Sequence, residues 1–399
     1  MSKKSKKGLM QQLFPAEGGT VPQLRFPEFL DAGEWGIKPL GESCDILNNL
    51  RKPITGSNRE KGFYRYYGAS GIVDYVKDYI FDEKLLLIGE DGAKWGAFEK
   101  TAFIVTGKYW VNNHVHVLRV KMVNDIFLEN YIIMLDIAPF ITGSAPPKLT
   151  LKNLKKIPIP VPQDKKEQQK IADCLSSIDD LITAQAKKIE SLKDHKKGMM
   201  QQLFPAEGET VPKLRFPEFR DAREWEEKQL VNLISTVIPP QKLLSESYLA
   251  EGLYPIIDQS QNYICGWTND QKAVIADFLP LIIFGDHTCL LKFVTEPFVQ
   301  GSDGIKILKT NELVESHYLY QFLRFNPLVM ESYKRHFSDL KEKQIVFPRK
   351  KTGEQQKIAD CLSSIDDLIT AQSQKIESLK AHKKGLMQQL FPVDNEEYM

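Results

Sequence analysis

Acidic and histidine side chains that follow short apolar stretches are the first candidates for chemistry in this chain. Asp286 and His287 come directly after an apolar run at residues 279–285, in the order of an acid and base pair. Neighbouring residues on a strand point to opposite faces, so we interpret this pair as a turn that satisfies its own hydrogen bonds. Residues 82–84 read Asp-Glu-Lys, as in a nuclease motif, but no upstream acidic partner has the right setting, which favours a solvated turn.

Motifs of nucleotide-dependent motors and of common hydrolases are absent. The chain contains no GxxxxGK[ST], GxGxxG, HExxH or GxSxG. The amino-methyltransferase tetrad, an Asp or Asn with two prolines and an aromatic residue, is missing too, since residues 145–148 and 238–241 do not fit it. The five cysteines are scattered and never spaced as CxxC, which argues against a disulfide framework and a zinc ribbon. We therefore expect no catalytic residue and no metal in this chain.

Polar and basic residues gather in two long variable segments. The basic ones near the segment ends are Lys148, Lys152 and Lys155 in the first and Arg335, Lys341 and Lys343 in the second. Lysine and arginine placed in this way contact phosphates and fix register on a duplex, although solvated surface charge is the alternative. The candidates for reading base edges are Asn112, Asn113 and His114 in the first segment, and His287 and Lys292 with Asp286 in the second. Each of these could equally cap a turn.

Composition describes a foldable chain of two or three domains. Of the 399 residues 42% are apolar, and 53 Lys and Arg stand against 52 Asp and Glu, for a net charge of +1. The first variable segment holds 17 basic and 13 acidic residues and the second 14 and 15, so the second is expected to bind nucleic acid poorly without partner surfaces. No apolar run of about 18 residues exists and the start lacks the features of an export signal, so we expect a cytoplasmic protein without membrane spans.

A duplicated segment sets the organisation of the chain. Residues 167–205 and 354–392 differ at four of 39 positions, and residues 6–29 match residues 196–219 with three differences in 24. The chain therefore begins with a copy of the last part of the repeated unit and ends with a copy of its first part. This order is expected if the two ends of the chain meet in space. The predicted parts are an N-terminal partial repeat (1–35), a first variable domain (36–162), a first helical spacer (163–205), a connector (206–225), a second variable domain (226–353) and a second spacer with a tail (354–399).

Each long repeat predicts one coiled-coil helix. Apolar residues alternate at spacings of four and three, and each helix of about 38 residues would be about 57 Å long. The predicted seam consists of Ile171, Leu175, Ile178, Ile182, Gln185, Ile189 and Leu192 in the first copy, and Ile358, Leu362, Ile365, Ile369, Gln372, Ile376 and Leu379 in the second. Two equal stripes separated by a domain favour pairing with each other. We prefer an antiparallel pair with a pseudo-twofold axis, which puts Gln185 near Ile376, over a parallel pair that sets Gln185 against Gln372.

The variable segments are predicted to be mixed α/β domains with short strands. Residues 85–96 and 109–120 have the pattern of strand, polar loop and strand, and residues 279–294 and 299–310 occupy the corresponding places. Both segments thus have the same order of strand, polar loop and strand, although their residues differ. The predicted fold is therefore α/β, or mixed α+β, with two globular domains separated by two long antiparallel helices.

The chain resembles the specificity subunit of type I restriction-modification systems over essentially its whole length. The resemblance depends on the cyclic repeat, on IPIPVP at 157–162 followed by EQQKIA at 167–172, on YYGASGIVDY at 66–75, on LIGEDGA at 87–93 and on IFGDHT at 283–288. It implies a non-catalytic DNA reader. Each variable domain would be a recognition domain that reads half of a bipartite, asymmetric site in double-stranded DNA, and the helices would set the gap between the two halves.

The same resemblance implies partners that hold the cofactors. Two methyltransferase subunits would carry S-adenosylmethionine, and restriction or translocase subunits would carry ATP and Mg. Two other functions stay open from the residues alone. One is a stand-alone metal-dependent nuclease that uses Glu90, Asp91 and Asp286, and the other is a duplicated adaptor for protein ligands.

Overall fold

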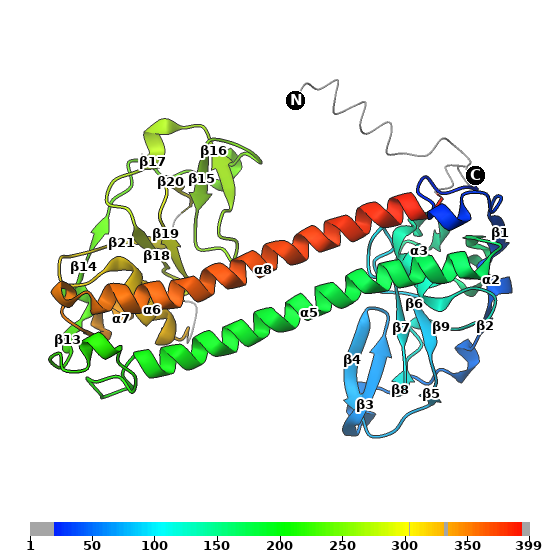
Figure 1. Cartoon of the computed structure of the whole chain (residues 1–399), viewed down its shortest axis with the longest axis horizontal. Helices are drawn as coiled ribbons and strands as arrows, with labels where there is room; N and C mark the ends of the chain where they lie inside the picture. Colours follow the sequence, from blue (N-terminus) through cyan, green and yellow to red (C-terminus); the bar gives the residue numbers. More distant parts are fainter. Residues whose placement is uncertain (1–19, 303, 331–333, 393–399) are drawn as a thin grey trace. The chain divides into compact units, whose positions relative to one another are not determined.

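The long repeats form two helices because their caps and breakers stand at the right places. The computed structural model describes residues 20–302, 304–330 and 334–392, and in it α5 runs over Lys165–Leu203 and α8 over Glu354–Leu390 (Figure 1). The Asp164 carboxylate accepts a hydrogen bond from the Lys166 amide at 2.8 Å at the start of α5. Gly353, with a left-handed φ of 80°, precedes α8, and the Thr352 hydroxyl accepts from the Glu354 amide at 3.3 Å.

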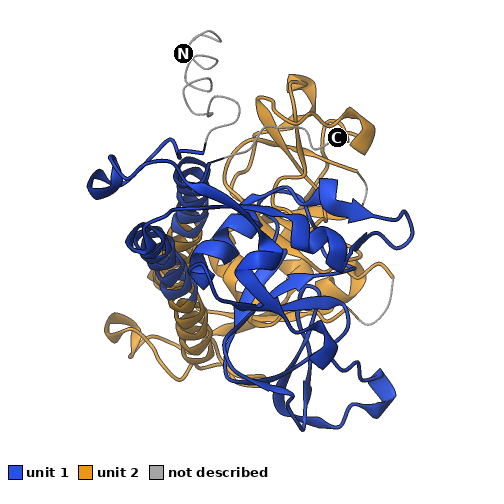
Figure 2. Ribbon diagram, turned by 90° about the vertical axis from the view of Figure 1, so that its right-hand side faces the viewer, with its two compact units in different colours: residues 1–186, 374–399 blue, residues 187–373 orange. Residues whose placement is uncertain are grey.

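The chain divides into two compact units that share both helices. Unit 1 consists of residues 1–186 and 374–399, and unit 2 of residues 187–373 (Figure 2). Each unit therefore contains one recognition domain, one half of α5 and one half of α8. Among the described residues, no helix has both the length and the apolar character needed to cross a membrane.

Among its described residues, unit 1 holds two four-stranded sheets and two two-stranded ones (Figure 1). The first has the order β2 (Cys44–Ile46), β9 (Val115–Val120), β6 (Leu85–Gly89) and β7 (Ala102–Val105), and the second β4 (Gly71–Val76), β3 (Lys61–Gly68), β8 (Lys108–Val111) and β5 (Phe81–Asp82). β1 (Gly36–Pro39) pairs with β12 (Pro158–Val161), and β10 (Ile141–Thr142) pairs with β11 (Lys148–Leu149). The helices besides α5 and α8 are α2 (Leu40–Ser43), α3 (Asp125–Met134) and α4 (Leu151–Lys156), with 3-10 turns at Pro27–Phe29, Asn48–Leu50, Gly56–Asn58 and Ala138–Phe140.

Unit 2 repeats this plan with other residues. One sheet has the order β14 (Ile234–Val237), β21 (Ile305–Thr310), β18 (Leu281–Gly285) and β19 (Leu291–Val294), and the other β16 (Gly266–Thr268), β15 (Tyr254–Ile257), β20 (Phe298–Gln300) and β17 (Val274–Ile275). β13 (Glu226–Gln229) pairs with β22 (Gln344–Phe347), and the helices are α6 (Ser316–Phe325) and α7 (Phe337–Glu342). The 3-10 turns are Pro217–Phe219, Leu230–Asn232, Ser245–Ser247, Gln271–Ala273 and Lys350–Thr352. Both four-stranded sheets have the strand order of their counterparts in unit 1, and β1–β12 recurs as β13–β22. The parallel pair β3–β8 recurs as β15–β20, whereas β10–β11 has no counterpart among the described strands of unit 2.

The two helices run antiparallel within each unit, as the repeat predicted. In unit 1 the first turns of α5, with Ile171 and Leu175, share one core with Met387 and Leu390 at the end of α8. In unit 2 the end of α5 shares a core with the start of α8 in the same way. All fourteen residues of the predicted seam are buried or half-buried.

The register also follows from contacts inside the units. Asp179 of α5 faces Lys383 of α8 in unit 1, with 2.7 Å between Oδ2 and Nζ. Six residues further along α5 and six back along α8, Gln185 comes level with Glu377, one residue from the predicted neighbour Ile376. The Gln185 Oε1 is buried and has no hydrogen-bond partner among the described residues, which agrees with apolar surroundings.

Each recognition domain is fixed to the helix pair by aromatic packing. In unit 1 the ring of Phe391, just after α8, lies 5.0 Å from Phe127 of α3 and 5.7 Å from Tyr131, measured between centroids. In unit 2 the equivalent Phe204, just after α5, lies 5.6 Å from Tyr318 of α6 and 5.4 Å from Phe322. Both phenylalanines are fully buried.

The described part of the N-terminal partial repeat lies at the end of α8, so the cyclic arrangement is confirmed there. The Leu24 amide donates to the Gln389 carbonyl at 2.9 Å, as the Leu214 amide donates to Gln202 at 2.8 Å in unit 2. Arg25 makes two hydrogen bonds to the carboxylate of Glu167, at 2.7 and 2.8 Å. Residues 6–19 of this repeat lie outside the described residues.

Candidate functional site

The most polar cluster of unit 1 lies where β6 ends and β9 begins, and we call this region the loop end of unit 1. At its centre is Glu90, whose side chain is nearly buried and accepts hydrogen bonds from Arg51 Nη1 and, at 2.8 Å, from Lys148 Nζ. Burial opposes ionisation of Glu90, but the hydrogen bonds from Arg51 and Lys148 outweigh it and keep the pKa of the carboxyl below its ordinary value. Glu90 is thus an ionised anchor that fixes two cations.

Three of the predicted polar residues lie in the adjoining turn. The Asn112 side-chain oxygen accepts from the His114 amide at 2.8 Å, and His114 Nδ1 lies 2.5 Å from Asp91 Oδ1. Asn113 is exposed, and its carbonyl accepts from Arg51 at 3.3 Å. Asn112 itself is only 7% exposed and its side chain caps the turn, whereas half of the His114 side chain reaches solvent.

A hydrogen-bonded pair of the half-buried Asn48 and the buried His116 adjoins this region. His116 Nδ1 lies 2.8 Å from Asn48 Nδ2, and His116 Nε2 lies 2.7 Å from the Leu149 carbonyl. An amide nitrogen can only donate, so Nδ1 accepts and Nε2 carries the proton that it donates to Leu149. Burial lowers the pKa of His116, which favours this neutral form.

Basic residues of α4 provide exposed charge beside the loop end. Lys152 and Lys155 are both exposed, and neither makes an ion pair with another described residue. The helix itself starts at Thr150, whose hydroxyl accepts from the Asn153 amide at 3.3 Å. Among the predicted phosphate contacts of unit 1, Lys148 is therefore held by Glu90 and the two lysines of α4 stay available to solvent.

The loop end of unit 2 is built on an acidic residue at the same place. Asp286 follows β18 as Glu90 follows β6, and its amide donates to the Gly304 carbonyl at 2.7 Å. Its carboxylate accepts from the Phe337 amide at 2.9 Å, so it caps α7. His287 lies beside it, with Nδ1 3.1 Å from the Lys334 carbonyl, and Arg335 is exposed.

Contacts or burial within the fold engage the remaining basic candidates of unit 2, which are Lys292, Lys341 and Lys343. Lys292 on β19 is 7% exposed, and its ammonium group donates to the carbonyls of Asp258 at 2.8 Å and Asn262 at 2.6 Å. Lys341 lies over the Phe337 ring with Nζ 5.4 Å from the centroid. Burial lowers the pKa of Lys343, although Glu207 acts against this. A direct contact of these lysines with DNA stays a prediction.

Sequence patterns missed several residues that the structure presents. Arg51 lies in a loop without periodicity, and only its ion pair with Glu90 reveals it. Phe63 on β3 is 96% exposed and is flanked on its strand by the exposed Lys61 and Arg65. The combination of two basic and four aromatic residues within 61–67 is the signal that could have found this strand.

The acidic side chains of the turns considered for metal-dependent cleavage are engaged within the fold. Glu90 is paired with cations, Asp91 with His114, and Asp286 caps a helix. No group of three or more His, Cys, Asp or Glu in the described part of the chain is arranged to hold a metal ion.

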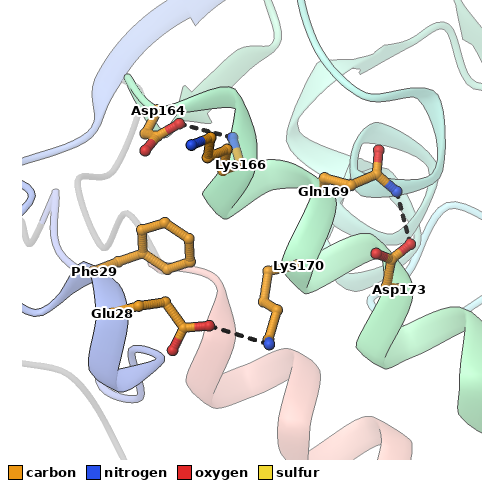
Figure 3. Close-up of a pocket in the computed structure, with 7 residues that line it drawn as sticks. All are labelled: Glu28, Phe29, Asp164, Lys166, Gln169, Lys170 and Asp173. Atoms are coloured by element: carbon orange, nitrogen blue, oxygen red, sulfur yellow. Dashed lines mark hydrogen bonds and ion pairs between the residues drawn. The ribbon is translucent and has the colours of Figure 1, made fainter.

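A polar pocket of about 530 Å³ lies in unit 1 beside the first turns of α5 (Figure 3). Glu28 and Lys170 form an ion pair at 3.1 Å across it, and Gln169 donates to Asp173 at 2.7 Å. Unit 2 repeats these contacts in its own copy of the repeat, with Lys357 and Glu218 at 3.5 Å and Gln356 and Asp360 at 2.7 Å. The helical repeat thus presents the same polar groups once in each unit.

Comparisons with known proteins agree with this architecture. A sequence model of the type I restriction modification DNA specificity domain matches residues 32–194 and 222–381. The putative type I restriction enzyme specificity subunit S.HindORF215P of Haemophilus influenzae is 39% identical over 155 residues, which are 38% of this chain and only 40% of that protein. The type I restriction enzyme MjaVIII specificity subunit of Methanocaldococcus jannaschii is 24% identical over 92% of this chain and 93% of its own length.

One solved structure supports the fold over nearly the whole chain. The crystal structure of the type I restriction-modification S subunit of M. genitalium aligns with a TM-score of 0.62 at 15% identity, and the alignment covers 94% of this chain and 99% of that one. Since the family match accounts for both recognition domains and most of both helices, this chain belongs to the type I restriction-modification DNA specificity family.

Proposed function

We propose that this chain is the sequence-specific DNA-recognition subunit of a type I restriction-modification complex. Each recognition domain reads one half of a bipartite, asymmetric site in double-stranded DNA, and the chain performs no chemistry of its own. The observation that carries the proposal is that two domains whose four-stranded sheets have the same strand order present different residues at their loop ends. A shared scaffold with different side chains suits two readers of different sequences.

The loop ends supply the groups that such reading needs. In unit 1, Asp91 fixes the exposed His114 and Glu90 fixes Lys148, so both side chains are positioned hydrogen-bond donors near the surface. Positioned donors discriminate between base edges, whereas the exposed lysines of α4 suit phosphates. In unit 2 the exposed Arg335 occupies the corresponding place before α7.

The helix pair supports a spacer role. Helices α5 and α8 each take part in both units, and the seam of each half is buried or half-buried. A paired coiled coil resists bending, so we infer that its length sets the gap between the two half-sites.

The duplicated polar surface supports docking of two copies of one partner. The ion pairs Glu28–Lys170 and Glu218–Lys357 give both units the same contact groups, and identical surfaces bind identical partners. The partners we propose are two methyltransferase subunits that bind S-adenosylmethionine, joined by restriction or translocase subunits that use ATP and Mg. The specificity chain itself binds none of these cofactors.

The test is to find the motif that the assembled complex modifies. Genomic DNA of cells that express the chain with its methyltransferase partner is sequenced for modified adenines, with cells that lack this chain as the control. The proposal expects one motif of two short specified parts separated by a fixed run of unspecified bases. A continuous motif, or modification that does not depend on this chain, would refute it.

A further inference from the structure

A second candidate site lies in unit 2, in a pocket of about 250 Å³ bordered by β14, β20, β21 and the start of α7. Its lining includes Gln300, Lys306, Lys242 and Phe337. None of the predicted site residues lines it. The pocket therefore calls for an account separate from that of the loop-end residues above.

Gln300 is the unusual member of this lining. Its side chain is 3% exposed, and no hydrogen bond joins it to another residue of the described chain. Buried amides are normally hydrogen-bonded. The Gln300 amide is not among the fully sealed, unpartnered polar atoms of the described residues, so a group that fills the pocket can reach it.

The charge around the pocket favours an anionic occupant. Lys306 is half-buried on β21, with Nζ 5.5 Å from the centre of the Phe337 ring, and it forms no ion pair with a described residue. The described residues that line the pocket include Lys306 and no acidic side chain. A half-buried lysine and an amide that can donate two hydrogen bonds, both in the lining of one pocket, suit an oxyanion.

The matching place in unit 1 is filled. β9 pairs Leu118 with Ile46, and β21 pairs Leu308 with Thr236, so His116 corresponds to Lys306. There the bonded pair of Asn48 and His116 occupies the space. Two parallel pairs, Tyr67 with Val111 and Ile257 with Gln300, put an apolar valine at the position of Gln300.

Ile238, the residue just after β14, explains why unit 2 leaves the space open. Asn48 of unit 1 corresponds to Ile238, which cannot form the hydrogen bond to a strand partner and is 87% exposed. The same scaffold thus holds an internal Asn–His pair in one unit and an open, basic pocket in the other. The difference points to a ligand of unit 2 alone.

We propose that this pocket binds a backbone phosphate of the DNA half-site read by unit 2. Lys306 supplies the charge and the Gln300 amide donates to a second phosphate oxygen. The inference rests on the proposed function, and it gives the more acidic of the two recognition domains a built phosphate contact. Such a contact fixes the register of the domain on the duplex and carries no base preference.

The experiment measures affinity of the assembled complex, with its methyltransferase partner, for a duplex that carries its own bipartite site, over a series of salt concentrations. Each phosphate contact contributes about 0.9 to the slope of log affinity against log salt. Lys306→Met is therefore expected to reduce that slope by about 0.9, and Lys306→Arg to keep it. Lys309→Met, which removes the same charge three residues along β21, should leave the slope unchanged.

Gln300 provides a second and independent arm. Gln300→Glu keeps the size of the side chain but brings a negative charge into the pocket, so it should weaken binding more than Gln300→Met. In every variant the preferred bases should be those of the wild type. Thermal melting of each complex shows whether the variants fold.

The outcomes separate this inference from the proposed function. If the wild-type complex binds its bipartite duplex and Lys306→Met keeps the full slope, the phosphate pocket is wrong and the proposed function stands. Equal loss of slope in Lys306→Met and Lys309→Met would also overturn the pocket, because it would reflect net charge alone. If the wild-type complex shows no preference for any bipartite duplex, the proposed function fails and the pocket assignment fails with it.

Discussion

Lys196 of α5 donates to both carboxylate oxygens of Asp366 of α8, at 2.7 and 2.6 Å, inside unit 2. Lys383 and Asp179 repeat this contact inside unit 1. The Lys196 side chain is 6% exposed, so the seam of the helix pair contains a charged layer that depends on its partner. Burial lowers the pKa of Lys196 against the attraction of Asp366, which means that the ion pair offsets a desolvation cost.

Removal of Asp366 should therefore destabilise unit 2 more than removal of Lys196. Asp366→Ala leaves a buried ammonium with only the Gln321 side-chain oxygen at 2.9 Å, and we expect a loss of about 2–4 kcal/mol in the free energy of unfolding. Lys196→Met leaves Asp366 near Arg324 at 3.3 Å and should cost less. Urea unfolding of both variants checks the order, and an equal or reversed order would contradict the described role of the pair.

The two Arg–Glu pairs that attach the connector segments give a matched prediction. Arg215 makes two hydrogen bonds of 2.7 Å to Glu354, as Arg25 does to Glu167, and both glutamates are buried. Arg25→Ala and Arg215→Ala each leave a buried carboxylate without its main partner, so each should lower the free energy of unfolding by about 3 kcal/mol. Thermal melting with Lys170→Ala as a surface control measures this. Loss in Arg215→Ala alone would mean that the N-terminal partial repeat contributes nothing to unit 1.

The neutral His116 predicts a pH dependence of stability. Its pKa is lowered in the folded protein, mainly by burial, so below about pH 6.5 the unfolded chain takes up a proton that the folded chain does not. The free energy of unfolding should fall as the pH drops through this range. Urea unfolding at pH 7.5 and 5.5 measures it, and His116→Gln should lose part of the dependence. An unchanged dependence in that variant would show that other groups cause it.

Much of the frame could be predicted from the sequence because local periodicity determines it. The seam from Ile171 to Leu192 follows from heptad spacing, and the position of Gln185 beside Ile376 follows from an antiparallel pairing of equal stripes. The strand regions were also predictable from short apolar runs next to Gly-rich turns. These features depend on residues that are close together in the chain.

The sites were harder to predict because they depend on pairings between distant strands. Whether Gln300 is buried is decided by the parallel pairing of β15 and β20, and no local pattern shows that its amide lacks a partner. Lys292 is a lysine, a residue type that often contacts phosphates. In this chain, however, three carbonyls of the loop at residues 258–263 surround its ammonium group. Arg51 is recognised as part of the site only from its ion pair with Glu90.

Glu90 and Asp286 should each affect one half of the recognised site. Glu90→Gln weakens the hold on Arg51 and Lys148 in unit 1, and Asp286→Asn weakens the cap of α7 in unit 2. Under the proposed function we expect each variant to lose about 1–3 kcal/mol of discrimination at one half of the motif and to keep the other half. Selection from randomised duplexes by the assembled complex measures both halves. Relaxation of both halves by either variant would contradict independent readers.

The length of the helix pair gives the most direct test of the central claim. One heptad is inserted into α5 and one into α8, between Gln185 and Ile189 and at the matching place between Gln372 and Ile376, so that the antiparallel seam is preserved. Seven residues add about 10.5 Å, which equals about three base pairs of duplex. Sequencing of modified adenines in cells that express this variant with the methyltransferase should yield the same two half-motifs with a gap about three base pairs longer. The same half-motifs with an unchanged gap would contradict the account.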